Sequence, residues 1–267
     1  MTSANGTALI TGASSGLGAI YADRLARRGF DLILVARGKE ALATVAGTIV
    51  DATGRSVATV QADLGSPEDL RRVEAVLKDN SSITMLVNNA GVGSVEPLLK
   101  ANVDDMERMI EINIVALTRL VHAAVPAFVE RKRGTVINLA SALALAPGMF
   151  NGVYGASKAF VVALTQSLDK ELSGSGLRFQ AVLPGAIATA FWKASGGSLD
   201  HLPERAVMHA EDAVDAALAG LDLGELITLP SLPDVSEWDA YDTARRNLIP
   251  KISLNKPAQR YLTAARA

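Results

Sequence analysis

Short apolar runs alternate with helical patterns along almost the whole of this sequence. The runs at residues 31–35 (Asp-Leu-Ile-Leu-Val) and 83–87 (Ile-Thr-Met-Leu-Val) place apolar side chains on both sides of an extended chain. Strands of parallel sheets have this character because both of their faces are buried. The pattern therefore predicts an α/β fold in which a mainly parallel sheet is covered by helices on both sides, a doubly wound architecture.

The alternation predicts seven strands in a single domain that covers residues 1–267. No repeat, low-complexity tract or linker interrupts the pattern, and the length suits one large α/β domain. Residues 186–210, interpreted as a substrate loop, and residues 231–267, interpreted as a carboxyl-terminal tail, fit the pattern least. Pro126 marks the place where a kink would fall in the longest helix. The expected strands are residues 8–10, 31–35, 56–61, 83–87, 135–139, 177–183 and 225–229, and the expected helices are residues 16–28, 39–53, a helix opened by Ser66 and Pro67, and residues 103–131, 152–172 and 211–221.

The composition excludes several classes of function. Hydrophobic residues make up 49% and charged residues 20% of the chain, which is typical of a globular protein and not of a disordered one. The net charge is −2, and the basic cluster at residues 131–133 ends an expected helix, where cations stabilise the negative pole. We therefore expect no nucleic-acid partner. With no cysteine and three histidines, we expect no metal site.

The sequence also favours a particular location. The amino terminus is polar before the first strand, so we expect no signal peptide. No run reaches 18 apolar residues, so we expect no membrane partner. A cytoplasmic location is the resulting prediction.

A glycine-rich segment follows the first expected strand directly and opens the first expected helix. Residues 11–18 read T-G-A-S-S-G-L-G. Glycines let the backbone approach a ligand closely, and the unpaired N–H groups at a helix start favour an anion. The placement predicts a site for the pyrophosphate of a dinucleotide, whereas the alternative is a glycine-rich turn without a ligand. The residues of this predicted site are Gly12, Ser14, Ser15, Gly16, Leu17 and Gly18.

Tyr154 and Lys158 lie four residues apart in an expected helix, which puts both side chains on one helical face. An ammonium roughly 4 Å from a phenol favours the phenolate by up to about 4 kcal/mol at an effective dielectric near 20. This spacing predicts a lowered pKa for Tyr154, by up to about three pKa units. Ser141, at the end of the preceding strand, is placed to hydrogen-bond an oxygen that faces the phenol. The spacing also arises by chance in helices with one aromatic residue and one solvated lysine.

The glycine spacing G-x-x-x-G-x-G, combined with Y-x-x-x-K, resembles the short-chain dehydrogenase/reductase (SDR) family in its compact form. The resemblance covers nearly the whole chain. Residues 88–91, N-N-A-G, close the fourth expected strand as in that family, and residues 184–189 are similar to its P-G-x-x-x-T motif. The resemblance implies a Rossmann-type fold with Asn113, Ser141, Tyr154 and Lys158 as catalytic residues. It implies further cofactor contacts from Asp63, Leu64, Asn89, Ala90, Gly91, Tyr154, Lys158, Pro184, Gly185 and Thr189.

The same resemblance implies a reaction: hydride transfer between a nicotinamide and a small-molecule carbonyl compound or secondary alcohol. Tyr154 would exchange a proton with the substrate oxygen, and Lys158 would lower the pKa of Tyr154 and hold the nicotinamide ribose. Ser141 would orient the substrate oxygen, and Asn113 would anchor a water that links Lys158 to solvent. The resemblance also implies a homodimer or homotetramer, formed through the apolar helices near residues 103–131 and 152–172.

The end of the second expected strand indicates which cofactor is used. A carboxylate usually holds the ribose hydroxyls of NAD(H) at this place. Here the residues after Val35 are Ala36 and Arg37, so a guanidinium stands where the 2′-phosphate of NADP(H) would lie. A charge-assisted contact of this kind is worth roughly 1.5–3 kcal/mol. The sequence therefore predicts NADP(H) in preference to NAD(H), unless Arg37 is a solvated residue at the start of a helix.

The substrate is less defined than the reaction. Apolar residues gather around the Ser141–Lys158 segment and after Thr189, which favours an apolar carbonyl compound but also suits ordinary core packing. Two enzyme classes compete with this interpretation: a sugar-nucleotide epimerase or dehydratase and a methyltransferase. A non-catalytic dinucleotide-sensing protein is a third alternative. The tail could cover the pocket, contact another subunit or pack on the sheet. The apolar residues concerned are Leu143, Leu145, Met149, Phe150, Phe191 and Trp192 near the site, and the aromatic residues of the tail are Trp238, Tyr241 and Tyr261.

Overall fold

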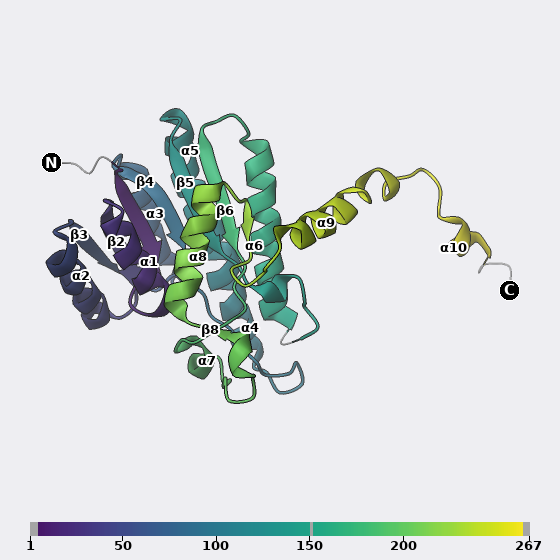
Figure 1. The fold of residues 1–267 in the computed structure, drawn as a ribbon, viewed down its shortest axis with the longest axis horizontal. Helices are drawn as coiled ribbons and strands as arrows, with labels where there is room; N and C mark the ends of the chain where they lie inside the picture. Colours follow the sequence, from purple (N-terminus) through teal and green to yellow (C-terminus); the bar gives the residue numbers. More distant parts are fainter. Residues whose placement is uncertain (1–4, 150–151, 264–267) are drawn as a thin grey trace. The chain divides into compact units, whose positions relative to one another are not determined.

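A parallel sheet of seven strands, in the order β3-β2-β1-β4-β5-β6-β9, forms the centre of the computed structural model (Figure 1). The structure describes residues 5–149 and 152–263. All six strand pairs of this sheet are parallel, which confirms the predicted doubly wound α/β fold. The predicted strands are confirmed to within one or two residues at either end. Their bounds are β1 Thr7–Thr11, β2 Asp31–Ala36, β3 Val57–Gln61, β4 Ile83–Asn88, β5 Gly134–Leu139, β6 Leu177–Val182 and β9 Ile227–Thr228.

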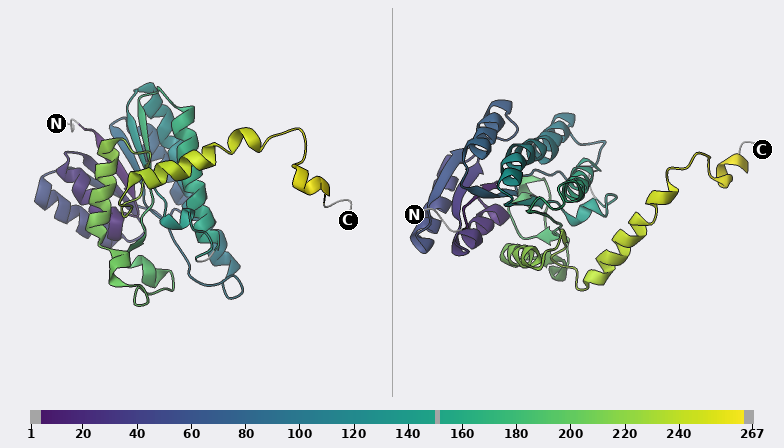
Figure 2. Two further views of the ribbon diagram at one scale, coloured as in Figure 1. Left: turned by 45° about the vertical axis from the view of Figure 1, so that its right-hand side comes forward. Right: turned by 90° about the horizontal axis from the view of Figure 1, so that it is seen from above.

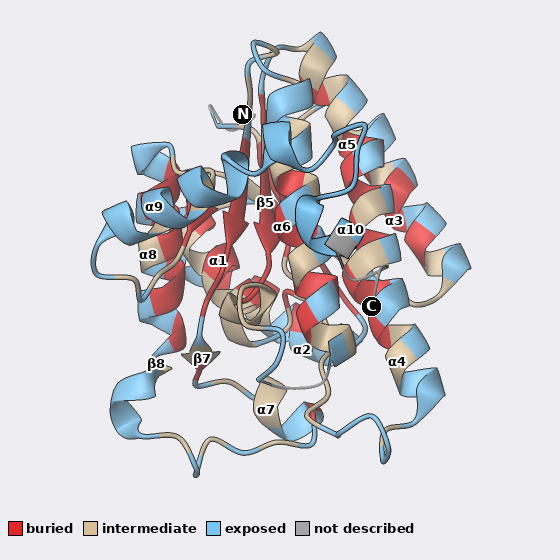
Figure 3. Cartoon of the chain, turned by 90° about the vertical axis from the view of Figure 1, so that its right-hand side faces the viewer, coloured by how far each residue is buried: buried red, intermediate tan, exposed pale blue. Residues whose placement is uncertain are grey.

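Helices cover both faces of the sheet (Figure 2). On one face α1 packs against α2 and α8, and on the other α3 packs against α5 and α4 against α6. The central strands are buried on both sides, as their continuous apolar sequences require (Figure 3). The helix over Pro67–Asp79 begins as predicted, because the Ser66 side chain accepts a hydrogen bond from the Asp69 N–H. The helix bounds are α1 Gly16–Arg27, α2 Lys39–Thr53, α3 Pro67–Asp79, α4 Val103–Ile110, α5 Leu117–Glu130, α6 Gly152–Glu171 and α8 Ala210–Leu223.

The long helix predicted over residues 103–131 is interrupted. A π-helical turn at Glu111–Ala116 separates α4 from α5, and Pro126 lies within α5. Sequence periodicity gives no signal for such a turn, because one added residue barely changes the spacing of apolar positions. Taken together, Val103–Glu130 is long and apolar enough to cross a membrane by length and composition alone. Half of the most apolar window is buried in the fold, as in core helices of soluble proteins, so this is weak evidence for a membrane span.

The predicted substrate loop contains short elements that the sequence pattern did not show. Strands β7 (Ala186–Ile187) and β8 (Val207–Met208) pair in parallel as a second small sheet. Between them lie helix α7 (Phe191–Ala194) and a 3₁₀ turn at Glu204–Ala206. Elements of two to four residues are too short to carry a periodic pattern, so they could not be predicted.

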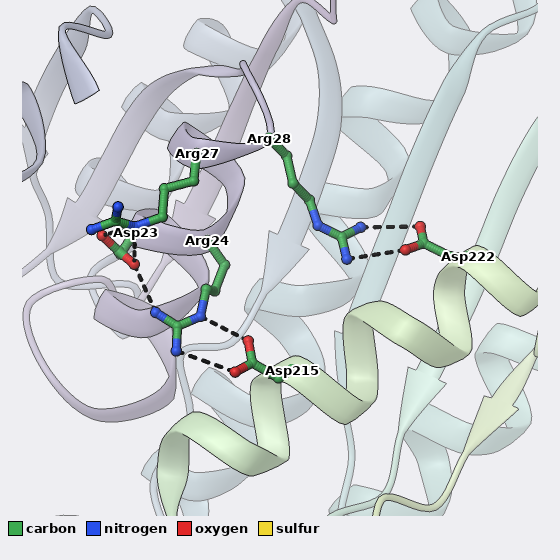
Figure 4. A network of polar contacts seen from close by, with 6 residues as sticks. All are labelled: Asp23, Arg24, Arg27, Arg28, Asp215 and Asp222. Carbon is green, nitrogen blue, oxygen red and sulfur yellow. Dashed lines mark hydrogen bonds and ion pairs between the residues drawn. The ribbon is translucent and has the colours of Figure 1, made fainter. Parts of the chain in front are cut away.

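A network of ion pairs joins α1 to α8 on the outside of the sheet (Figure 4). The Arg24 guanidinium donates to both carboxylate oxygens of Asp215, at 2.7 and 3.2 Å, and Arg28 pairs with Asp222 at 3.0 Å. Asp23 accepts from Arg24 and Arg27 within α1. Four of these six side chains are exposed, and Asp23 and Arg24 are half-buried, so the network links the two helices but adds little to the free energy of unfolding.

The chain divides into two compact units after Ser231, near the start of the predicted tail. The first unit carries the whole sheet. In the second, α9 (Val235–Arg246) begins at Asp234, whose carboxylate accepts from the Ser236 N–H at 2.9 Å. Helix α9 has no buried residue, and a short helix α10 (Gln259–Thr263) ends the described part of the chain.

Candidate active site

The strand order reverses between β1 and β4, and this reversal positions the candidate site. The chain leaves β1 toward the face that carries α1 and leaves β4 toward the face that carries α4. A crevice at the carboxyl ends of two such strands is where open α/β sheets bind their ligands. The glycine-rich segment and residues 88–91 both follow strands that end here.

Thr11 and Asn89 tie these two loops together. The Thr11 Oγ1 accepts from the backbone N–H groups of Asn89 and Ala90, at 3.1 and 3.0 Å. The Asn89 Nδ2 donates to the carbonyl oxygens of Thr11 and Gly12, at 2.9 and 3.2 Å. Asn89 was predicted to contact the cofactor. Its side-chain N–H groups instead hydrogen-bond to the glycine-rich loop and hold it in place. Sequence reasoning missed Thr11, although its place at the end of β1 was a usable signal.

The glycine-rich loop has the shape that a dinucleotide needs. Gly12 and Gly16 have φ angles of +66° and +54°, which favour glycine. The N-cap residue of α1, Ser15, makes no side-chain cap hydrogen bond, so the first N–H groups of α1 remain for an anion. A side chain at Gly16 would lie 3.6 Å from Thr189, so the loop also meets the P-G-x-x-x-T segment. These features fit the pyrophosphate of NAD(P)(H).

Arg37 and Asp63 line one cavity of about 520 Å³ beyond β2 and β3, at the predicted adenosine end of the site. Arg37 is exposed, whereas Leu64 is buried. The Arg108 guanidinium donates to the Asp63 carboxylate at 2.8 Å, and the Gly65 N–H donates to it at 2.9 Å. Burial raises the pKa of Asp63, but these two donors outweigh it and hold the pKa below its usual range. Arg108 lies 45 residues away in the sequence, so nothing local could have indicated it.

Asn113 lies inside the π-helical turn and is almost fully buried. Its Nδ2 donates to the Val92 carbonyl at 2.9 Å and to the Ser157 Oγ at 3.1 Å, and its Oδ1 accepts from the Val92 N–H at 3.0 Å. The side chain therefore fixes the loop after β4 to helix α6. π-Helical turns are frequent at functional sites because they aim side chains that a regular helix would not. Ser157, which completes this contact, was not predicted.

Ser141, Tyr154 and Lys158 come together at the carboxyl end of β5. Tyr154 hydrogen-bonds to Ser141, which also caps a short 3₁₀ turn. Lys158 is buried, its Nζ donates to the Leu139 carbonyl at 2.8 Å, and the same Nζ lies 5.8 Å from the centre of the Tyr154 ring. The structure thus brings together the three residues that the sequence grouped.

The predicted direction of the Tyr154 pKa shift is wrong. Burial raises the pKa of Tyr154 to about 12, and the hydrogen bond from Ser141 only partly opposes this. Burial also lowers the pKa of Lys158 to about 8. The sequence argument counted the attraction between the two side chains but not the loss of water around both, and here desolvation is the larger effect.

Burial of Lys158 predicts a pH-dependent stability. Between pH 8 and 10.5 the unfolded chain holds a proton on Lys158 that the folded chain has released. The free energy of unfolding should therefore rise with pH across this window, by up to about 1.4 kcal/mol per pH unit from this group. Urea unfolding of the wild type and of Lys158→Met, from pH 7.5 to 9.5, measures this rise as the difference between the two. Parallel pH curves would contradict the lowered pKa of Lys158 in the folded chain.

Residues 184–189 continue from β6 toward the glycine-rich loop. Pro184 is buried, and its carbonyl accepts from the Ala142 N–H at 2.9 Å, which links this segment to the one that carries Ser141. Gly185 is exposed, and Thr189 lies beside Gly16. The predicted nicotinamide contacts are therefore placed between the dinucleotide loop and Tyr154.

The apolar residues proposed for the substrate pocket differ in their surroundings. The Phe191 ring lies against Tyr154, and the Trp192 indole N–H donates to the Ile187 carbonyl at 3.0 Å. Met149 is 68% exposed, so it is not core packing, and Phe150 lies outside the described residues. Leu143 and Leu145 are half-buried. The described part of the chain shows no cluster of three or more His, Asp or Glu residues that could hold a metal.

Comparison with known proteins identifies the family. A family model described as "short chain dehydrogenase" matches residues 6–198. The chain belongs to the short-chain dehydrogenase/reductase family, and it is an oxidoreductase that acts on alcohol or ketone groups with NAD(P)(H).

Two solved structures are similar over almost the whole chain. The first is a short-chain dehydrogenase from Sphingobium yanoikuyae in complex with NADPH, with 45% identity and a TM-score of 0.92 over 96% of this chain and 100% of that one. The second is the bulky-bulky ketone specific alcohol dehydrogenase from Comamonas testosteroni, with 40% identity and a TM-score of 0.89 over 96% of this chain and 98% of that one.

Curated relatives include the very-long-chain 3-oxoacyl-CoA reductase of Anas platyrhynchos, 36% identical over 198 residues, or 72% of this chain and 63% of that protein. The very-long-chain 3-oxoacyl-CoA reductase-B of Danio rerio is 35% identical over 205 residues, or 75% of this chain and 66% of that protein. The chain therefore spans less than two thirds of the length of these two relatives.

Proposed function

We propose that this chain interconverts ketones with large apolar substituents and the corresponding secondary alcohols, with NADP(H) as the hydride carrier. The observation that carries the proposal is the pairing of Tyr154 with Ser141 at the carboxyl end of the sheet, at the edge where the dinucleotide loop opens. Buried Lys158 stands beside this pair. This arrangement suits a proton donor and an orienting hydroxyl for a carbonyl oxygen.

The geometry supports a division of roles among these residues. When bound, NADPH supplies the hydride. The Tyr154 phenol is protonated at neutral pH, as an ordinary tyrosine is, and can donate its proton to the substrate oxygen as negative charge develops there. The Ser141 hydroxyl orients that oxygen, and the charge on Lys158 stabilises the phenolate that proton donation leaves behind. Asn113 acts through Val92 and Ser157, by fixing the loop and helix that frame the site.

The substrate class rests on the apolar lining and on the relatives. Phe191 lies against Tyr154, and Leu143 and Leu145 are half-buried on the segment that follows Ser141. The three relatives described above that are named for a substrate are named for large carbonyl compounds: a bulky ketone in one and a very-long-chain oxoacyl group in the other two. Turnover of a carbonyl panel with NADPH and with NADH, measured by nicotinamide absorbance, tests the proposal. Binding of either nucleotide without turnover of any carbonyl would favour a sensing role instead.

Arg37 supports NADP(H) as the preferred cofactor, and Arg37→Asp should reverse the preference. The ratio of kcat/KM with NADPH to that with NADH should fall by about 10- to 150-fold, because one charge-assisted phosphate contact is lost. Arg72→Ala is the matched control. Arg72 lines the same cavity, but its guanidinium is tied to Asp69 at 2.6 Å and to the Gln61 carbonyl at 3.1 Å. An equal loss in both variants would show that Arg37 has no special role.

We also propose that the protein forms a homodimer or homotetramer in the cytoplasm. Apolar side chains are exposed on the helices that were expected to pair: Ile110 ends α4, Val115 lies in the π-helical turn, and Phe160 lies on α6. Exposed apolar side chains of this kind are typical of protein interfaces. Sedimentation velocity of the purified chain tests the association, and a monomer at micromolar concentration would contradict it.

A further inference from the structure

The Phe191 ring lies directly against the candidate proton donor. The centres of the Phe191 and Tyr154 rings are 5.8 Å apart, with their planes inclined by 44°. This is the tilted packing that aromatic pairs favour, and it requires no ligand. Phe191 opens α7, two residues after Thr189, so its ring reaches the site from the substrate loop.

Gly93 makes the room that this ring occupies. A Cβ atom at Gly93 would lie 2.5 Å from the Phe191 Cζ and 3.1 Å from the Ser195 Oγ. Atoms cannot approach so closely, so any side chain at this position would displace the ring. The φ angle of Gly93 is not in the left-handed region, so the backbone itself does not require glycine. The space beside Phe191 is therefore the reason that the structure gives for glycine at this position.

A backbone hydrogen bond holds α7 to the loop that contains Gly93. The Val95 N–H donates to the Ser195 carbonyl at 3.1 Å, and a Cβ at Gly197 would lie 3.1 Å from Val95. The other end of this loop is fixed by Asn113 through Val92. The ring is thus held between Tyr154 and a loop that is itself anchored to the long helix.

We propose that Phe191, seated on Gly93, is the residue that determines which carbonyl substituents fit beside Tyr154. This inference rests on the proposed ketone reductase function and deepens it. The ring packs against the Tyr154 ring, so we expect it to limit the size of the group on one side of a carbonyl carbon that accepts the phenol proton at its oxygen. Since one methylene group in an apolar pocket changes kcat/KM by about 10- to 200-fold, one aromatic wall is enough to set the preference.

Phe191→Ala should therefore enlarge the accepted substituent. We choose two probes, phenyl methyl ketone and phenyl butyl ketone, which differ only in the alkyl group. The ratio of kcat/KM for the butyl ketone to that for the methyl ketone should rise by about tenfold or more, whereas the Kd of NADPH should stay unchanged. Ser195→Ala is the matched control, because its buried hydroxyl has no hydrogen-bond partner among the described residues, and it should leave the ratio unchanged.

The Gly93→Ala variant tests whether the space beside Gly93 positions the Phe191 ring. It should lower kcat/KM for both ketones, because the new methyl group pushes Phe191 toward Tyr154. The double variant Gly93→Ala/Phe191→Ala should recover most of this loss, since the clash needs both side chains. Failure of the second substitution to rescue the first would show that Gly93 serves another purpose. Thermal melting of each variant identifies any that has simply lost its fold.

Chemical modification tests whether Phe191 shields Tyr154 from solvent, and this test does not require the enzyme to turn over a substrate. Tetranitromethane should nitrate Tyr154 faster in Phe191→Ala than in the wild type or in Ser195→Ala, as measured by mass spectrometry of the tryptic peptides. A wild type that reduces no ketone would contradict the proposed function but leave this measurement valid. An unchanged nitration rate, or an unchanged ketone ratio in an active enzyme, would overturn the role of Phe191.

Discussion

Tyr154→Phe is expected to lower kcat for ketone reduction by about 10²- to 10⁴-fold, the range that one general acid contributes. The substitution removes a single oxygen from a side chain that is in contact with Phe191, Ser141 and the Lys158 helix turn. Its packing should persist, because phenylalanine has the same ring. The Kd of NADPH should change little, since the loop that holds the pyrophosphate lies on β1 and α1. Stopped-flow turnover and fluorescence titration measure the two effects separately.

Tyr21→Phe is the matched control for this loss. Tyr21 lies in α1, is fully buried, and its hydroxyl has no hydrogen-bond partner among the described residues. Removing an unpaired buried hydroxyl is neutral or stabilising, so this variant should keep the wild-type kcat and melt at the same or a higher temperature. Full activity of Tyr154→Phe would overturn the assignment of Tyr154, and an equal loss in both variants would point to a general effect of altered packing.

The sheet and the dinucleotide loop could be predicted because their signals are local. The apolar sequences of residues 31–35 and 83–87 are enough to predict a buried strand in each. The spacing of Gly12, Gly16 and Gly18 is enough to predict a tight turn before a helix. The residues that support the site could not be found in this way. Arg108 reaches Asp63 across 45 residues of sequence, and Ser157 reaches Asn113 across 44. Such contacts depend on how helices pack, which no short window of sequence contains.

The prediction of the Tyr154 pKa shift was wrong for a related reason. The spacing of Tyr154 and Lys158 correctly placed both groups on one face of α6, with the Lys158 Nζ 5.8 Å from the centre of the Tyr154 ring. The direction of each pKa shift, however, depends on how much water the fold removes, and burial is a property of the tertiary structure. A raised pKa makes the phenol a weaker acid, so proton donation by Tyr154 depends on the charge that Lys158 still carries near neutral pH.

Gly18→Ala is expected to damage both the fold and cofactor binding. A Cβ atom at Gly18 would overlap the Gly12 carbonyl oxygen and lie 2.5 Å from the Asn89 Nδ2. Neither neighbour can move freely, because Asn89 holds the carbonyl groups of Thr11 and Gly12. Overpacking costs typically about 1–3 kcal/mol, and each hydrogen bond lost adds about 1 kcal/mol. The free energy of unfolding should fall by roughly 3 kcal/mol, which lowers Tm by roughly 5–10 °C.

Gly47→Ala, in the middle of α2, separates this steric effect from the general effect of replacing glycine. Gly47 is exposed, and a Cβ atom there would meet nothing within 4 Å. Alanine should stabilise that helix by up to about 1 kcal/mol, so Gly47→Ala should melt at or above the wild-type temperature. In Gly18→Ala the Kd of NADPH should rise more than tenfold, measured at a temperature where the variant is still folded, because the displaced Gly12 and Asn89 no longer shape the turn at the start of α1. A folded Gly18→Ala variant with wild-type NADPH affinity would contradict the role of this loop as the dinucleotide cradle, whatever its effect on Tm.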